Sequence, residues 1–255
     1  ILHTHVLAED KVNQSQSITI FNWEDYLEPE LIKAFEQKYT ISVKQVFFDS
    51  DTDRDKLLLQ TNGAGFDVIS VNGASIESFR DIGWIQKLPK EKIPNLKHIE
   101  KRWLNIYEAA EDYAVPYFWG LLGIVYRKDL VTEPIHSWIQ LFKPAKELQG
   151  KILMVNSSRD LIGAALMALG FSANSGDKTE LLQAKELLLD QKPYLARLGY
   201  LRLNEESDLI NGAIIAASIY GGDALNLAQY HKDIRYIFPN DHEFCSPPMM
   251  KVASR

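Results

Sequence analysis

Aromatic and carboxylate side chains occur together at several places where an apolar, strand-like run ends. In "SITIFNWEDYL", residues 17–27, the alternating apolar positions stop, and Trp23, Asp25 and Tyr26 follow at once. Aromatic residues stand in "PYFWG" (116–120), a carboxylate stands in "SSRD" (157–160), and both occur in "YGGD" (220–223). Aromatic faces attract ammonium groups in dry pockets, and carboxylates accept their protons in charge-assisted hydrogen bonds. The pattern therefore predicts a site for a flexible ligand that carries several ammonium groups.

The same residue types also have ordinary structural explanations. Trp and Tyr at strand ends are often half-buried core residues, and an Asp before a helix is often its cap. Asp67 is expected to be a structural hydrogen-bond acceptor, and three tryptophans are expected to pack on helices: Trp84, Trp103 and Trp138. The acidic stretch of Asp49, Asp51, Asp53 and Asp55 either faces an approaching amine or caps and solvates a helix start.

Motifs for catalysis and for cofactors are missing from the sequence. It contains no G-x-S-x-G, H-E-x-x-H, Walker or Rossmann glycine motif, and its six histidines are scattered. A hydrolase that used Asp25 or Asp160 would need a paired base and an electrophile site, and an iron site would need a Tyr-Tyr or His/Tyr/Glu ligand set; the sequence shows neither. The single cysteine, Cys245, excludes an intrachain disulfide. We therefore predict a protein that is not an enzyme and that uses no cofactor or metal.

Composition is that of a globular protein, with 255 residues, 46% hydrophobic and 24% charged. A net charge of −6 and the lack of a basic block argue against nucleic acid as a partner. Residues 1–16 are interpreted as a leader or signal remnant, because Val6-Leu7-Ala8 before Glu9-Asp10 resembles the end of a secretory signal. This favours a periplasmic location, although a disordered leader would look the same.

Strands and amphipathic helices alternate regularly from residue 17 onward. We expect strands at 17–23, 42–48 and 66–71, with helices at 28–39, 51–61 and 74–82. A β-α-β-α-β order with short connections predicts a parallel, open α/β sheet, in which ligands bind beyond the carboxyl ends of the strands.

A second α/β region is expected from about residue 120. Two extended stretches around Gly120 are followed by a strand at 151–155 and by helices from Arg159 and at 178–192. We predict one lobe at 17–119 and another at 120–244, joined by strand-like hinge segments, with residues 245–255 as a divergent or truncated tail.

Several motifs in order resemble those of the periplasmic spermidine/putrescine-binding proteins of polyamine ABC transporters. They are the strand followed by "NWEDY", then "FDVI", "GWIQKL", "PYFWG" and "SWIQLFKP", and finally "RD" with "LGFSAN", over about residues 17–240. The resemblance implies a type II periplasmic binding protein fold, with two α/β lobes, a hinge and ligand between the lobes.

The resemblance also implies roles for individual residues. Asp160 matches an acid that binds an amine from the second lobe, and Tyr220 stands where transport proteins often have a stacking tryptophan. The predicted ligand-binding residues are Trp23, Asp25, Tyr26, Asn72, Trp119, Ser157, Asp160, Tyr220 and Asp223.

The sequence departs from the family pattern in several places. Ser157 replaces a carboxylate, and Ala74 stands where a tyrosine would lie over the ligand. The family's W-x-D motif near the end is replaced by "FPNDHEFCSPPMMKVASR". We therefore expect the returning strand and the C-terminal helices to be missing. We also expect a lower ligand affinity than in family members that have the W-x-D motif.

The predicted function is capture of a linear polyamine for an ABC importer. The alternative is a periplasmic polyamine sensor that signals to a membrane receptor with cyclic-dinucleotide output. The stretches "YGGDAL" and "VFFDSDTDRDKLLL" resemble this sensor branch more than the transport branch. A permease complex or a receptor is thus the expected partner, and the protein is expected to be a monomer.

Overall fold

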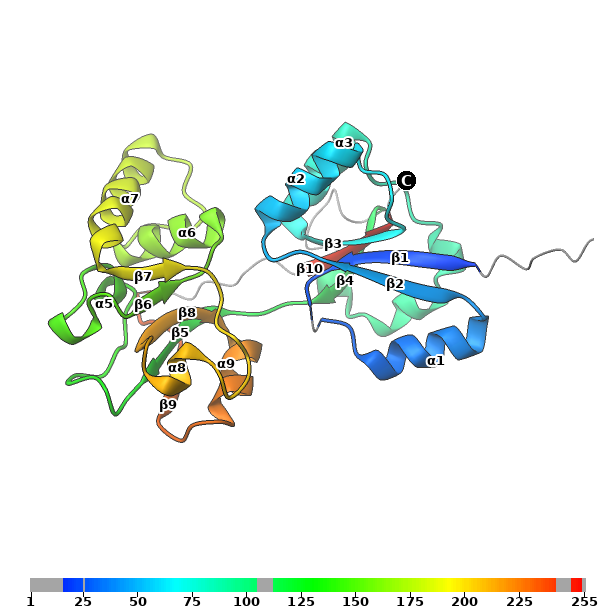
Figure 1. Cartoon of the computed structure of the whole chain (residues 1–255). Coiled ribbons are helices and arrows are strands. Elements are labelled where there is room, and N and C mark those ends of the chain that lie inside the picture. The colour runs from blue at the N-terminus through cyan, green and yellow to red at the C-terminus, as the bar shows by residue number, and fades with distance from the viewer. Residues whose placement is uncertain (1–15, 25, 105–111, 242–248, 254–255) are drawn as a thin grey trace, which may run out of the picture. The chain divides into compact units, whose positions relative to one another are not determined.

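The computed structural model describes residues 16–24, 26–104 and 112–241, together with the backbone of 249–253. The chain divides into two compact units, residues 1–116 with 250–255 and residues 117–249 (Figure 1). It leaves the first unit within strand β4 (Ala114–Phe118) and returns at strand β10 (Met249–Ala253). In the described parts of the chain, no helix is long and apolar enough to cross a membrane.

The first unit contains a sheet of strand order β2-β1-β3-β10-β4. β1 (Ser17–Asn22) runs parallel to β2 (Ser42–Phe47) and to β3 (Val68–Asn72), as the alternating pattern predicted. Asp67 accepts a hydrogen bond from the Thr19 N–H at 2.7 Å, which confirms its structural role.

Helices lie on both faces of this sheet. α2 (Asp51–Thr61) and α3 (Ile76–Ile82) cover one face, and α1 (Pro29–Tyr39) covers the other (Figure 1). Pro29 starts α1 in its first turn, where a missing N–H costs nothing. The described residues of this unit also include α4 (Lys101–Leu104) and the 3-10 turns η1 (Gly73–Ser75), η2 (Lys90–Lys92) and η3 (Pro94–His98).

The core of the first unit lies under α2 and α3. The Phe21 ring stacks on Phe66 with centroids 4.4 Å apart and meets Phe48 edge to face at 4.9 Å. Trp84 is buried in this core, and any Cβ at Gly63, whose φ is +76°, would lie 2.6 Å from its ring. Trp84 follows α3 rather than lying on a helix as predicted. Trp103 is only half-buried, with the Arg102 guanidinium 4.9 Å from its ring.

Strand β10 corrects one prediction. It enters the first sheet between β3 and β4, so the expectation that the returning strand is missing is wrong. The stretch 245–255, predicted to be a divergent tail, thus contains an ordinary strand. The short apolar run "MMKVA" forms this strand without the family's W-x-D motif.

The second unit contains a mixed sheet of strand order β7-β6-β8-β5-β9. β5 (Leu122–Arg127) is antiparallel to β8 (Ala216–Tyr220) and β9 (Ile234–Ile237). β6 (Ile152–Met154) is parallel to β8 and to β7 (Leu195–Leu198). Any Cβ at Gly123 would come within 2.5 Å of the Ile237 carbonyl oxygen, so glycine lets β5 and β9 pack closely there.

Both faces of the second sheet carry a hydrophobic core. α5 (Ile139–Phe142), α6 (Ser158–Ala168) and α7 (Lys178–Gln191) pack on one face, where Trp138 is fully buried. α8 (Asp208–Asn211) and α9 (Gly221–Ala228) pack on the other face (Figure 1). Alternate residues of β5 enter the two cores, Ile124 the first and Val125 the second. Two 3-10 turns complete the unit, η5 (Lys146–Leu148) and η6 (Lys192–Tyr194).

Candidate ligand-binding site

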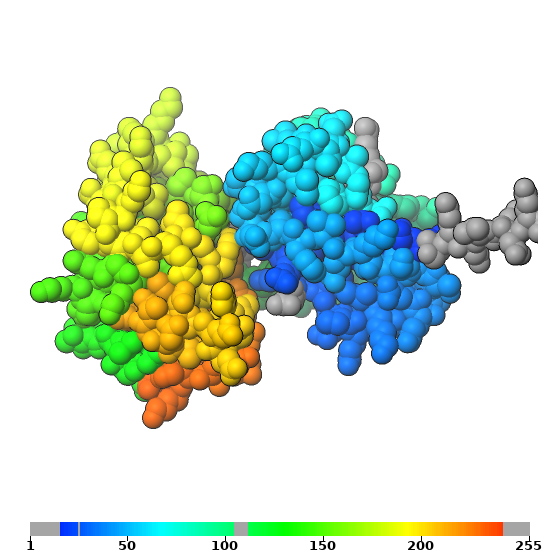
Figure 2. All heavy atoms as spheres, in the orientation of Figure 1, coloured from blue at the N-terminus to red at the C-terminus, as the bar shows by residue number. Residues whose placement is uncertain are grey.

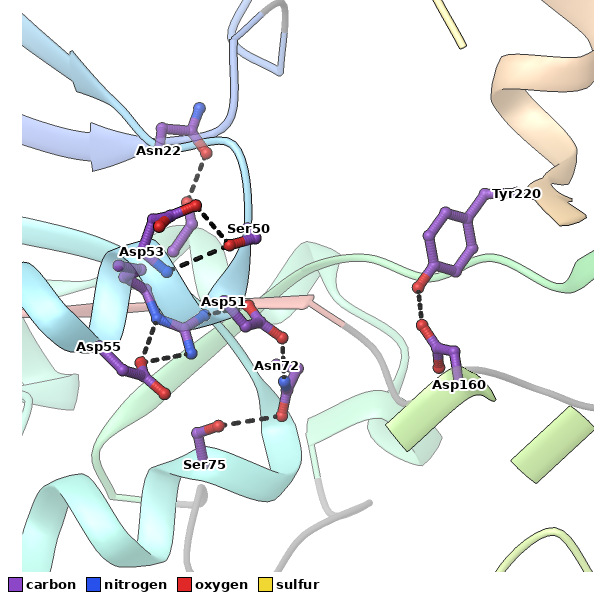
Figure 3. Close-up of polar contacts among 11 residues, drawn as sticks. Asn22, Ser50, Asp51, Asp53, Asp55, Asn72, Ser75, Asp160 and Tyr220 are labelled. Atoms are coloured by element: carbon purple, nitrogen blue, oxygen red, sulfur yellow. Dashed lines mark hydrogen bonds and ion pairs between the residues drawn. The ribbon is translucent and has the colours of Figure 1, made fainter. Parts of the chain in front are cut away.

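A buried carboxylate and a phenol meet in the second unit. Asp160 lies in the first turn of α6 and is 4% exposed, and Tyr220 is the last residue of β8. The Tyr220 hydroxyl donates a hydrogen bond to Asp160 Oδ2 at 2.5 Å (Figure 3). The Ser157 hydroxyl caps α6 by accepting from the Asp160 N–H at 3.4 Å. The structure thus brings together three predicted site residues from a helix start and a strand end.

The helix start favours a negative charge at this position. The unsatisfied N–H groups in the first turn of a helix carry a partial positive charge, which stabilises a nearby carboxylate. A charge-assisted hydrogen bond from a phenol adds to that stabilisation. Together these contacts can hold Asp160 in one orientation, as recognition of an ammonium group requires.

Asp223 and Tyr236 lie close to the Tyr220 end of β8. Asp223 is half-buried in the first turn of α9, directly after the strand. The Tyr236 hydroxyl donates to the Leu121 carbonyl at 2.8 Å. Burial, and next to it the charge of Asp223, raises the pKa of Tyr236 to about 12. Tyr236 therefore stays neutral at physiological pH, while Asp223 adds negative charge to this region.

The carboxyl ends of β1 and β3 carry polar and aromatic residues in the first unit. Asn22 is fully buried, and its Oδ1 accepts from the Ser70 hydroxyl at 2.5 Å (Figure 3). Trp23 is half-buried against Phe48, with ring centroids 4.7 Å apart. Tyr26 is half-buried as well, and Asp25 lies outside the described residues. The aromatic part of the predicted site in this unit thus stands at the predicted edge of the sheet.

Asn72 ends β3 and is held by two side chains. Its Nδ2 donates to Asp51 Oδ2 at 2.8 Å, and its Oδ1 accepts from the Ser75 hydroxyl at 3.2 Å (Figure 3). Ser50 caps α2 by accepting from the Asp53 N–H, and the Ser50 hydroxyl donates to the Asp53 carboxylate. Asp51 and Asp53 therefore lie in the first turn of α2, and the capping residue is Ser50 rather than one of the aspartates.

Arg54 is the residue of this region that the sequence reasoning missed. Its guanidinium is fully buried and pairs with Asp51 and Asp55. The only sequence signal was a single basic residue inside a run of aspartates.

Trp119 follows β4, and its side chain is 49% exposed. A shallow cavity of about 280 Å³ lies elsewhere in the second unit, lined by residues between Val131 and Leu148. None of the predicted ligand-binding residues lines this cavity. Its lining mixes apolar, acidic and basic residues from α5, η5 and the chain around them, and we assign it no role. Among the described residues, no group of three or more His, Cys, Asp or Glu side chains could hold a metal ion.

The chain forms two α/β units and passes between them twice. Each unit carries polar side chains at the carboxyl ends of its strands. These features are typical of bilobal solute-binding proteins. The chain belongs to the bacterial extracellular solute-binding protein family, whose sequence profile matches residues 30–251. Members of this family are solute-binding proteins, so the chain is not an enzyme, as predicted.

The names of individual relatives refer to polyamines. The chain is 32% identical over 229 residues to the putrescine-binding periplasmic protein SpuD of Pseudomonas aeruginosa, covering 85% of this chain and 60% of that protein. It is 29% identical over 217 residues to the norspermidine sensor of Vibrio cholerae, covering 84% of this chain and 58% of the sensor. The chain thus spans about 60% of the length of these relatives.

A solved structure agrees with the sequence relatives. The spermidine/putrescine ABC transporter substrate-binding protein PotD of Streptococcus pneumoniae superposes with a TM-score of 0.72 at 25% identity, covering 94% of this chain and 73% of that one. These matches confirm the predicted fold class and the resemblance to periplasmic spermidine/putrescine-binding proteins.

Proposed function

We propose that this protein binds a linear polyamine in the periplasm, in a cleft lined by both units, and delivers it to an ABC importer. The observation that carries the proposal is the buried Asp160 carboxylate, held by Tyr220 at a helix start. A protonated amine that reaches Asp160 adds a second charge-assisted hydrogen bond to the one from the phenol. The names of the putrescine-binding and spermidine/putrescine-binding relatives support the same ligand class.

The residues of the first unit complete the proposed site. A polyamine carries its charges several bonds apart, so it needs acceptors and aromatic faces at more than one point along its length. Trp23, Tyr26 and Asn72 supply aromatic and polar surface at the carboxyl end of the first sheet. Trp119 and Asp223 extend the proposed site, and Asp25 belongs to it by its position in the "NWEDY" motif.

Calorimetric titration with putrescine, spermidine and norspermidine tests the proposal. We expect a saturable heat of binding for at least one of them. The control variant Asp190→Asn, which removes an exposed carboxylate on α7, should bind with the affinity of the wild-type protein. The absence of heat with all three ligands at millimolar concentration would contradict the polyamine assignment.

A sensor is the second candidate, because the norspermidine sensor matches a similar share of the chain as the putrescine-binding protein does. The two functions share the ligand and differ in the partner of the ligand-bound protein. Deletion of the gene distinguishes them. Loss of uptake of radiolabelled polyamine supports the importer, and an altered cyclic-dinucleotide concentration with normal uptake supports the sensor.

A further inference from the structure

Arg54 is a buried cation of α2 that is linked to Asn72 through Asp51. Its side chain is 0% exposed. The guanidinium carbon lies 5.6 Å from the centroid of the Phe48 ring and 5.5 Å from that of Phe79. A buried charge is costly unless it is paired and hydrogen-bonded. Its partners therefore show what the charge is used for.

The hydrogen bonds of Arg54 lead to a predicted ligand contact. Nη1 donates to Asp51 Oδ1 at 2.5 Å, while Nε and Nη2 donate to Asp55 Oδ1 at 2.9 and 2.8 Å. The other oxygen of Asp51 accepts from Asn72 Nδ2 at 2.8 Å, and Asn72 in turn accepts from Ser75. Figure 3 shows this chain of contacts from α2 to the end of β3.

We propose that Arg54 is a positioning residue for polyamine recognition. It fixes Asp51, so that the Asn72 amide is held at the carboxyl end of β3. It also pairs with Asp51 and Asp55, so that it offsets part of their negative charge and holds both carboxylates within the fold, away from the ligand's ammonium groups. This inference rests on the proposed function and extends it to a residue that does not itself touch the ligand.

The conservative variant Arg54→Lys separates positioning from charge. Lysine keeps the positive charge but cannot reproduce the planar fork that joins two carboxylates. We expect Arg54→Lys to lower spermidine affinity in calorimetry by about tenfold or more, the size that follows loss of a hydrogen bond to a charged group. Circular dichroism should show that the fold is kept.

Arg127→Lys is the matched control. Arg127 is a buried arginine of the second unit that pairs with Asp129 through Nε and Nη2 and donates to the Leu209 and Ile210 carbonyls. The control should lower thermal stability and leave the affinity unchanged. An affinity loss equal to that of Arg54→Lys would mean that general loosening of the fold explains both, and would overturn the proposal.

A double-mutant cycle tests whether Arg54 acts through Asn72. Asn72→Ala alone should weaken binding, and Arg54→Lys combined with Asn72→Ala should bind no worse than Asn72→Ala. Additive losses, or an unchanged affinity of Arg54→Lys beside a weakened Asn72→Ala, would contradict the positioning role.

A measurement without ligand keeps this test apart from that of the proposed function. The side-chain amide protons of Asn72, followed by NMR, should exchange slowly in the wild-type protein and fast in Arg54→Lys. Equal exchange in both proteins would overturn the positioning role. If the wild-type protein shows slow exchange but binds no polyamine, the proposed function and the recognition role of Arg54 are both contradicted. The Arg54–Asp51–Asn72 linkage itself would still stand.

Discussion

All six residues of β5 in the second unit are buried, and so are the first four residues of β8. In the first unit, β1 has two buried residues and β2 has none. Helix α1 contributes no buried residue to its sheet, and Leu31 on it is 62% exposed. The space-filling view shows α1 along the surface of the first unit (Figure 2). The second sheet is thus packed on both faces, whereas the first has its described core mainly on the α2 and α3 face.

This difference shows how each unit can hold its part of the proposed site. In the second unit, Asp160 and Tyr220 stand on elements anchored in two hydrophobic cores. In the first unit, Asn72 depends on the hydrogen bonds around Arg54 as well as on packing. We therefore expect binding to depend on core packing in the second unit and on the polar network in the first.

The largest effect is expected from the core of the second unit. Trp138→Ala removes a fully buried indole and should lower the free energy of unfolding by about 3–5 kcal/mol, because the cavity collapses only in part. Urea unfolding followed by circular dichroism measures this loss. Leu182→Ala, at a position 58% exposed on α7, is the control and should be nearly neutral. A loss below about 1 kcal/mol for Trp138→Ala would contradict the account of a close-packed second unit.

Asp160→Asn should weaken polyamine binding by about 2–5 kcal/mol if its carboxylate pairs with a buried amine. The substitution keeps the shape of the side chain and removes its charge. Calorimetry measures the affinity, with Asp190→Asn as the control for loss of one negative charge at an exposed position. Equal affinities of the two variants would leave Asp160 with a structural role only, in the first turn of α6.

Tyr220→Phe isolates the hydroxyl from the aromatic ring. It removes the donor to Asp160 and should weaken binding by about 1–2 kcal/mol, because the carboxylate loses a charge-assisted partner while the ring is kept. The same titration tests this expectation. A variant that binds as tightly as the wild-type protein would show that the phenol does not orient Asp160 for the ligand.

The smallest effect concerns acid stability in the second unit. Hydrogen bonds from Arg127 are the main cause that lowers the pKa of Asp129 to about 2, from an ordinary value near 3.8. Because the pKa is lower in the folded state, this pair stabilises the fold above about pH 4, and its contribution is lost as the pH falls toward 2. Asp129→Asn should therefore lose less stability than the wild-type protein between pH 7 and pH 2.5, as urea midpoints would show. An identical pH dependence would contradict the ion-pair explanation.

The regular parts of the fold were predictable from the sequence, because hydrophobic periodicity and short connections specify a parallel β-α-β-α-β sheet. The antiparallel pairing of β5 with β8 and β9 was not, because it joins segments far apart in the chain. Strand β10 escaped prediction because it is short and lacks the expected motif.

The placement of candidate site residues was predictable at strand ends, where Asn72 and Tyr220 are the last residues of their strands and Trp23 directly follows one. Arg54 was not, because a lone arginine among aspartates resembles a solvated helix start. Its burial depends on Phe48 and Phe79, which come from a strand end and another helix. The proposed role of Asp160 came from the family resemblance, and its hydrogen bond to Tyr220 emerged only from the fold.

The central claim is that one amine ligand is bound by both units. Hydrogen exchange with and without saturating spermidine tests it most directly, because amide protection reports each unit separately. The account predicts that spermidine slows exchange both at Asn72–Ser75 in the first unit and at Ser157–Leu161 in the second, and slows it less at Asn72–Ser75 in the Arg54→Lys variant. Slower exchange in one unit alone, or in neither, would contradict it.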